Sequence, residues 1–121
     1  MKRLNAAIIF AFIVHSCSQK EQLHYVDKMP VGRGEIMKPF NGYELALKKG
    51  DVMYFYSDGF GDQFGGPHGK KYKVKRMQKF LSGIHTLNTN EQKQKLYDEF
   101  NEWKREREQI DDVCIVGIKI N

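Results

Sequence analysis

A run of β-prone residues, Val52–Tyr56, ends directly in Ser57-Asp58-Gly59. Valine and aromatic residues in an unbroken series are typical of a buried strand. A carboxylate follows where the strand stops, and the glycine after it lets the chain turn away without crowding the aspartate. This feature predicts a buried strand that presents Asp58 at its end, where a glycine-rich loop over residues 58–71 begins.

The segments on either side predict an α/β domain with its helices on one face of the sheet. Tyr43–Leu47 alternates apolar with polar or small residues, and the turn at residues 48–51 would make it a hairpin partner of Val52–Tyr56. Val113–Ile120 is a second apolar run and predicts a final strand, in which Cys114 would be a small core residue.

Two helices are predicted between these strands. Apolar residues at helical spacing favour a helix from Val74 to about Gly83. Thr89-Asn90-Glu91-Gln92 has the form of a capping box and predicts the start of a second helix. Its apolar face would carry Leu96, Phe100 and Trp103. The expected order is strand, strand, helix, helix, strand.

Composition sets outer bounds on function. The chain has 121 residues, of which 40% are hydrophobic and 29% charged, so a single globular domain is expected. The net charge of +5 fits phosphorylated or otherwise anionic partners, or simply a solvated surface. The same alternatives apply to the basic run in residues 70–76. No aromatic-and-basic motif stands out, so no nucleic acid partner is expected.

Residues 1–20 differ from the rest and allow two interpretations. Lys2 and Arg3 precede an apolar stretch, Ala6–Val14, that is too short to span a bilayer but suits a signal peptide. Val14–Cys17 resembles a lipoprotein cleavage box, in which Cys17 would carry lipid. The chain would then be exported and would meet a membrane only through that lipid. The alternative is a buried first strand or an upstream remnant.

The carboxylates suggest a chemistry. Asp58 follows one predicted strand and Asp111 precedes another, so pairing of the two strands would place both on one rim. Carboxylate oxygens hold hard cations such as Mg²⁺ or Mn²⁺, which activate water for attack on a phosphoryl group. From the residues alone this signal is weak, because Asp-Gly after a strand is more often only a turn and Asp111-Asp112 also suits a simple helix-to-strand connection.

Longer segments resemble the protein phosphatase 2C superfamily, in particular its bacterial branch typified by the stage II sporulation protein E phosphatase domain. Leu47–Gly59 is similar to that branch's strand-and-Ser-Asp-Gly segment, and Gln109–Ile118 to its closing strand. Asp27–Gly32 and the loop over residues 62–71 fit as well. The resemblance covers residues 23–121 and implies the C-terminal part of a phosphatase domain.

The resemblance implies roles for several residues. Asp58 and Asp111 match metal ligands of the family, whose members hold two Mg²⁺ or Mn²⁺ ions. Both aspartates would be metal ligands rather than general acids or bases, so no residue is assigned as a catalytic acid or base. Asp112 and Gly59 match supporting positions. Asp62 matches an acidic position that either reaches a weaker metal or caps the loop.

One expected motif is missing. Relatives carry an earlier Asp-Gly whose aspartate bridges both metals, and no Asp-Gly precedes Asp58 here. We therefore expect a metal-dependent protein serine/threonine phosphatase domain of bacterial signalling type that is incomplete and weakly active alone. Its partners would be a phosphorylated protein substrate and a chain that supplies the missing half, and its location cytoplasmic. The alternative is a non-catalytic interaction protein, lipid-anchored through Cys17, that retains half of the fold.

Overall fold

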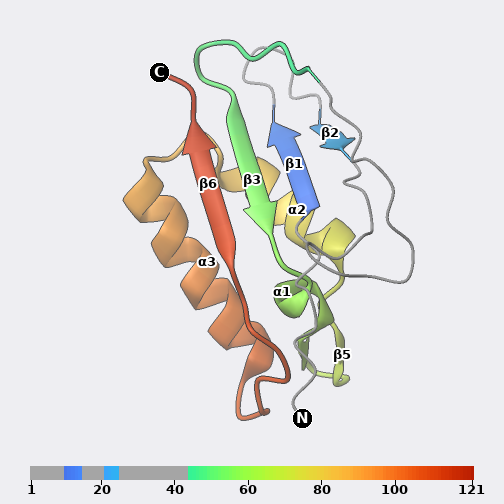
Figure 1. The fold of residues 1–121 in the computed structure, drawn as a ribbon. Helices are drawn as coiled ribbons and strands as arrows, with labels where there is room; N and C mark the ends of the chain where they lie inside the picture. The colour runs from blue at the N-terminus through green and yellow to red at the C-terminus, as the bar shows by residue number, and fades with distance from the viewer. Residues whose placement is uncertain (1–9, 15–20, 25–43) are drawn as a thin grey trace, which may run out of the picture.

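The computed structural model describes residues 10–14, 21–24 and 44–121. Its main sheet has four antiparallel strands in the order β2-β1-β3-β6. Two longer helices, α2 and α3, cover one face of this sheet (Figure 1), which confirms the predicted α/β class with helices on one face. The strands are β1 (Phe10–Val14), β2 (Glu21–His24), β3 (Val52–Tyr56) and β6 (Ile115–Lys119), and the helices are α2 (Val74–Ile84) and α3 (Thr89–Lys104).

The segment between β3 and α2 contains small elements that position the candidate site. A single helical turn, α1 (Gly59–Asp62), follows β3 directly, and β4 (Phe64–Gly65) then pairs with β5 (Lys70–Lys71). The glycine-rich stretch predicted as a loop therefore contains a short helix and a small hairpin. Both lie at the end of the sheet where β3 finishes (Figure 1).

The core lies between the sheet and the helices. Val52, Tyr54 and Tyr56 of β3 are each 1% exposed, whereas the alternating Met53 and Phe55 are half-buried. The period of two shows that β3 buries one face completely, as its sequence predicts. The cluster on this face also contains residues of β1, α1, α2 and α3, among them Val14, Phe60, Met77, Leu81 and Phe100.

The helices follow their predicted limits closely. Met77, Leu81 and Ile84 are the buried residues of α2. The start of α3 differs by one residue, because Asn88 rather than Thr89 is the N-cap. The Asn88 Oδ1 accepts the Glu91 N–H at 2.9 Å, and the Glu91 Oε2 accepts the Asn88 N–H at 3.2 Å. Asparagine is a stronger cap than threonine, so the box begins one position earlier.

Two predictions about strands are wrong. Residues 44–48 form no regular structure, so the expected 43–47 hairpin strand is absent from the described part of that segment. β3 instead pairs with β1 on one side and β6 on the other, which leaves it no free edge. Cys114 is exposed rather than in the core. It precedes β6 at the edge of the sheet, where only alternate side chains reach the helices.

The described part of the N-terminal apolar stretch, Phe10–Val14, forms a strand in the middle of the sheet. β1 lies between β2 and β3, and its Ile13 and Val14 are buried. This arrangement corresponds to the buried first strand among the alternatives that the sequence leaves open. Cys17 and Asp27–Gly32 lie outside the described residues, so lipidation of Cys17 stays a prediction. Within the described part of the chain, no helix is long and apolar enough to cross a membrane.

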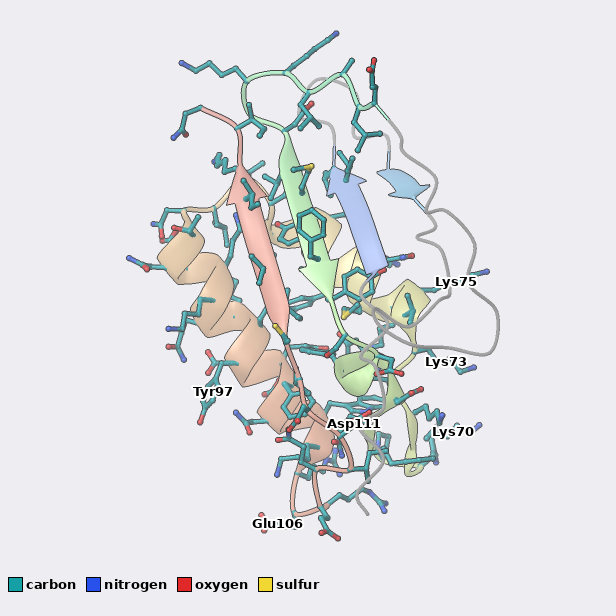
Figure 2. All side chains as sticks on the ribbon, viewed as in Figure 1. Lys70, Lys73, Lys75, Tyr97, Glu106 and Asp111 are labelled. Carbon is teal, nitrogen blue, oxygen red and sulfur yellow. The ribbon has the colours of Figure 1, made fainter. Side chains whose placement is uncertain are left out.

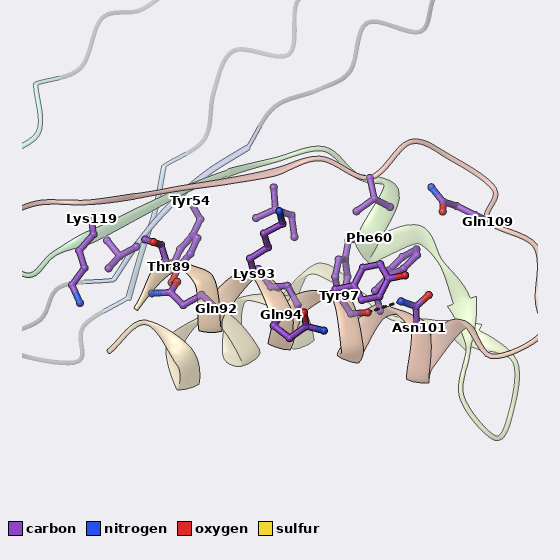
Figure 3. A pocket seen from close by; sticks show the side chains of 16 residues that line it. Tyr54, Phe60, Thr89, Gln92, Lys93, Gln94, Tyr97, Asn101, Gln109 and Lys119 are labelled. Atoms are coloured by element: carbon purple, nitrogen blue, oxygen red, sulfur yellow. Dashed lines mark hydrogen bonds between the residues drawn. The ribbon is translucent and has the colours of Figure 1, made fainter. Parts of the chain in front are cut away.

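A groove of about 710 Å³ runs between α3 and the edge strand β6 (Figure 3). Tyr54 of β3 and three residues of α3, Gln92, Lys93 and Tyr97, are among the residues that line it. The Tyr54 hydroxyl donates to the Gln92 Oε1 at 2.6 Å. Burial raises the pKa of the Tyr54 hydroxyl well above its usual range, which keeps it protonated as a donor.

We expect Gln92→Ala to lower the free energy of unfolding by about 1–3 kcal/mol, because buried partners lose their hydrogen bonds. The Gln92 Nε2 donates to the backbone oxygens of His85 and Leu87, and the loss would also leave the Tyr54 hydroxyl unpaired. The matched control is Gln94→Ala, since Gln94 is exposed and bonds only Asp98 on its own helix. Urea unfolding of both variants measures the difference. Equal stability of the two would contradict this role.

Candidate functional site

The two acidic motifs meet at the end of the sheet where β3 finishes and β6 begins. Tyr56 and Ile115 form the last pair of the β3–β6 ladder. Beyond it, the Ser57 N–H donates to the Cys114 oxygen at 3.0 Å. The Ser57 hydroxyl donates to the Asp112 oxygen and accepts the Cys114 N–H, both at 3.0 Å. The backbones that carry Asp58 and Asp111-Asp112 therefore run side by side, as the sequence predicts for paired strands.

The absence of a side chain at Gly59 allows the two backbone segments to approach this closely. A Cβ atom at Gly59 would lie 2.3 Å from the Asp112 oxygen and 2.9 Å from its carbonyl carbon. The predicted reason for the glycine, a sharp turn that leaves room for Asp58, is therefore incomplete. The chain enters the helical turn α1 here, with Asp58 as its half-buried N-cap. The main requirement at Gly59 is contact with the neighbouring backbone.

The other acidic side chains have partners of their own. The Asp62 Oδ1 accepts a hydrogen bond from the Lys71 Nζ at 3.0 Å in a half-exposed ion pair. The Asp111 Oδ1 accepts the Asp112 N–H at 2.8 Å. Asp111 and Asp112 are exposed, and Asp111 lies beside α1 (Figure 2). The site thus has an accessible rim of carboxylates around the start of α1.

These residues supply only part of a metal site. Carboxylate oxygens are suitable donors for Mg²⁺ or Mn²⁺. Among the described residues, however, no three side chains of the metal-binding types gather closely enough to hold an ion. The donor chemistry of Asp58 and Asp111 therefore fits, and the described donor set is incomplete.

A family model described as Stage II sporulation protein E (SpoIIE) matches residues 2–121. The chain belongs to the SpoIIE family. Among solved structures, it is similar to the "SiaA-PP2C domain of Pseudomonas aeruginosa", with a TM-score of 0.81 and 24% identity. The match covers 95% of this chain and 44% of that one, so this chain spans less than half of the solved domain. A comparison with curated proteins gave no match.

The family match and the structural likeness confirm the resemblance to phosphatase 2C-like domains and support a phosphatase-type domain. The identity of 24% means that the likeness to the solved domain establishes the fold alone. The arrangement of the SpoIIE-family motifs around Ser57 and Gly59 is the structural basis for the proposals below.

Gln63 is a further residue of this SpoIIE-family site that the sequence analysis missed. It is 0% exposed, and its Nε2 donates to the Phe64 oxygen at 3.0 Å and the Glu108 oxygen at 2.9 Å. Its own backbone oxygen accepts from the Trp103 Nε1 at 3.0 Å. Gln63 thereby fixes the segment before Asp111 against α1. Two of its partners, Trp103 and Glu108, lie 40 and 45 positions away, so no local pattern could have revealed these contacts.

We expect Gly59→Ala to destabilise the SpoIIE-family fold by about 1–3 kcal/mol, because the new methyl group overlaps the Asp112 backbone. Gly83→Ala is the matched control. Gly83 lies in α2 with open space around its Cα, so alanine there should stabilise the helix by about 0.5–1 kcal/mol. Thermal unfolding of the two variants should show shifts of opposite sign. A Gly59→Ala protein as stable as the parent would contradict the close approach.

We expect Ser57→Ala to cost about 1–3 kcal/mol of stability, because the Asp112 oxygen and the Cys114 N–H lose their shared partner. Ser82→Ala is the control, since the Ser82 hydroxyl bonds only the Gln78 oxygen one turn back in α2. Hydrogen exchange at the Cys114 amide gives a local measurement. It should accelerate in Ser57→Ala and stay unchanged in Ser82→Ala. Unchanged protection in both would show that the hydroxyl does not hold the two segments together.

Proposed function

We propose that this chain is part of a metal-dependent protein serine/threonine phosphatase domain of bacterial signalling type. Asp58 and Asp111 are its metal ligands, and Asp112 supports them. The observation that carries the proposal is the joining of both acidic motifs through Ser57 and Gly59. That joining brings the backbones of the two acidic motifs together in a phosphatase 2C-like fold, which supports the assignment of Asp58 and Asp111 as ligands.

The proposed roles follow from the chemistry of the side chains. Asp58 and Asp111 donate carboxylate oxygens to Mg²⁺ or Mn²⁺ and act neither as general acid nor as general base. A cation held by these residues would lower the pKa of water and so supply the nucleophile for phosphoester hydrolysis. Ser57, Gly59 and Gln63 contact neighbouring backbone groups and keep the two ligand-bearing segments in register.

We further propose that a second polypeptide segment completes the domain. Less than half of the solved SiaA domain corresponds to this chain, and the described residues offer an incomplete donor set. β6 is an edge strand, and its Val116 and Ile118 are 49% and 44% exposed on the face away from the helices. Covering that apolar face would stabilise the domain. A cytoplasmic location and a phosphoprotein substrate agree with such a signalling role.

The metal assignment predicts a loss of Mn²⁺ affinity in carboxamide variants. We expect Asp58→Asn and Asp111→Asn each to weaken Mn²⁺ binding about tenfold or more. Even the loss of a residue that only hydrogen-bonds a metal ligand lowers metal affinity by about tenfold. Asp98→Asn, on the exposed face of α3, is the control and should bind Mn²⁺ like the parent. Electron paramagnetic resonance of free Mn²⁺ measures binding independently of turnover.

Turnover of a small aryl phosphate with Mn²⁺ is the second measurement. The chain alone should show little activity, and that activity should fall further in Asp58→Asn. If the parent and both carboxamide variants bind Mn²⁺ equally, the site assignment is wrong. If none of them binds Mn²⁺ at millimolar concentration, the non-catalytic interaction protein becomes the better description.

A further inference from the structure

Three lysines beside the candidate site form a basic surface: Lys70 on β5, Lys73 at the N-cap of α2 and Lys75 in its first turn. All three are exposed. Figure 2 shows their side chains projecting to the same side of the molecule, next to α1. The sequence marks this run as basic but leaves open whether it is a binding surface or ordinary solvated charge.

The charges of the basic surface are not neutralised within the described structure. The neighbouring Lys71 pairs with Asp62, and Arg76 pairs with Glu99 at 3.4 Å. By contrast, no carboxylate of the described residues lies within 4.0 Å of the Lys70, Lys73 or Lys75 ammonium group. With the adjacent cations paired, three positive charges without a partner in the described part of the chain remain along one side of the molecule.

The basic surface is attached rigidly to the carboxylate rim. The Lys73 N–H donates to the Gly61 oxygen of α1 at 2.8 Å, and the Tyr72 N–H donates to the Gln63 oxygen at 3.0 Å. The Lys71–Asp62 ion pair joins β5 to the same helical turn. Since Asp58 is the N-cap of α1, these contacts hold the segment that carries the lysines beside the segment that carries Asp58.

We propose that the basic surface docks acidic residues flanking the phosphorylated side chain of a protein substrate; this inference rests on the proposed phosphatase function. A site built from carboxylates repels an acidic phosphopeptide unless cations compensate nearby. Complementary charge beside the site raises the association rate and aligns the substrate. The substrate class is therefore a phosphoserine or phosphothreonine segment with glutamate or aspartate next to the phosphate.

The surroundings of the basic surface favour a peptide over nucleic acid. Single-stranded nucleic acid binding needs free aromatic faces on which bases stack. The nearby rings of Tyr72 and Trp103 are already covered by the Arg76 guanidinium, at 4.7 Å and 4.4 Å from their centroids. Tyr72 is in addition buried. The Phe64 ring on β4 is 40% exposed, but the Lys71 Nζ lies over it at 5.8 Å from its centroid. Cations therefore already cover a face of each of these rings.

Fluorescence anisotropy with the full chain tests the proposal at low salt, with and without Mn²⁺. One labelled peptide carries phosphoserine between glutamates, a second carries phosphoserine between glycines, and a third carries unphosphorylated serine between glutamates. We expect the first to bind about tenfold more tightly than the second, because each of three exposed ion pairs contributes a little. High salt should remove most of this preference.

Two matched variants locate the binding. Lys70→Gln/Lys73→Gln/Lys75→Gln should lose the preference for acidic flanks, with folding checked by circular dichroism. Lys48→Gln/Lys93→Gln/Lys95→Gln removes the same charge from exposed lysines before β3 and on α3 and should keep it. Equal binding of the first two peptides, or equal loss in both variants, overturns the proposal. Tighter binding of single-stranded DNA or of anionic vesicles than of the acidic peptides also overturns it.

The outcomes separate this inference from the phosphatase proposal. If acidic flanks strengthen binding through Lys70, Lys73 and Lys75 but phosphate adds nothing with Mn²⁺, the docking surface stands and the metal site fails. If phosphate with Mn²⁺ strengthens binding through Asp58 but the flanks have no effect, the metal site stands and the docking surface is refuted.

Discussion

The pairing of β3 with β6 is the constraint on which the candidate site depends. Antiparallel pairing that ends at Tyr56 and Ile115 makes the chain leaving one strand meet the chain entering the other. The Ser57 hydroxyl then continues the contact beyond the ladder by bonding both Asp112 and Cys114. The intervening segment, from α1 to the end of α3, must therefore bring the chain back to the same end of the sheet.

An aromatic cluster packed against α1 stabilises the intervening segment from α1 to α3. The Phe60 ring lies 4.9 Å from that of Tyr72 and 5.1 Å from that of Phe100, and Tyr72 packs edge-on against Trp103 at 5.3 Å. Burial, and then the hydrogen bond to Glu99, raise the pKa of the Tyr72 hydroxyl, so it donates to that carboxylate. Because Phe60 belongs to α1, packing of α3 against the cluster also fixes the turn that carries Asp58.

The sequence predicted those features that depend on local pattern. β3, α2 and the apolar face of α3 have clear periods, and the two motifs were placed correctly because they flank strands that do pair. The predicted strand at residues 43–47 is wrong because strand pairing depends on segments distant in sequence. β1 pairs with the side of β3 that the predicted hairpin strand would have occupied. Gln63 was missed for the same reason, since its role appears only when distant segments meet.

The way the carboxylate segments are joined also bears on the role of a cation. Two acidic motifs brought together only by a shared metal would separate without it, because like charges repel. Here the contacts are uncharged: a serine hydroxyl shared by two backbone groups, and a glycine that allows backbone contact. These contacts therefore need no cation to form. Under the proposed metal assignment, the number of ligands rather than their placement would limit the affinity. A segment that contributes one more carboxylate to this preformed rim would raise the affinity without rearranging β3 or β6.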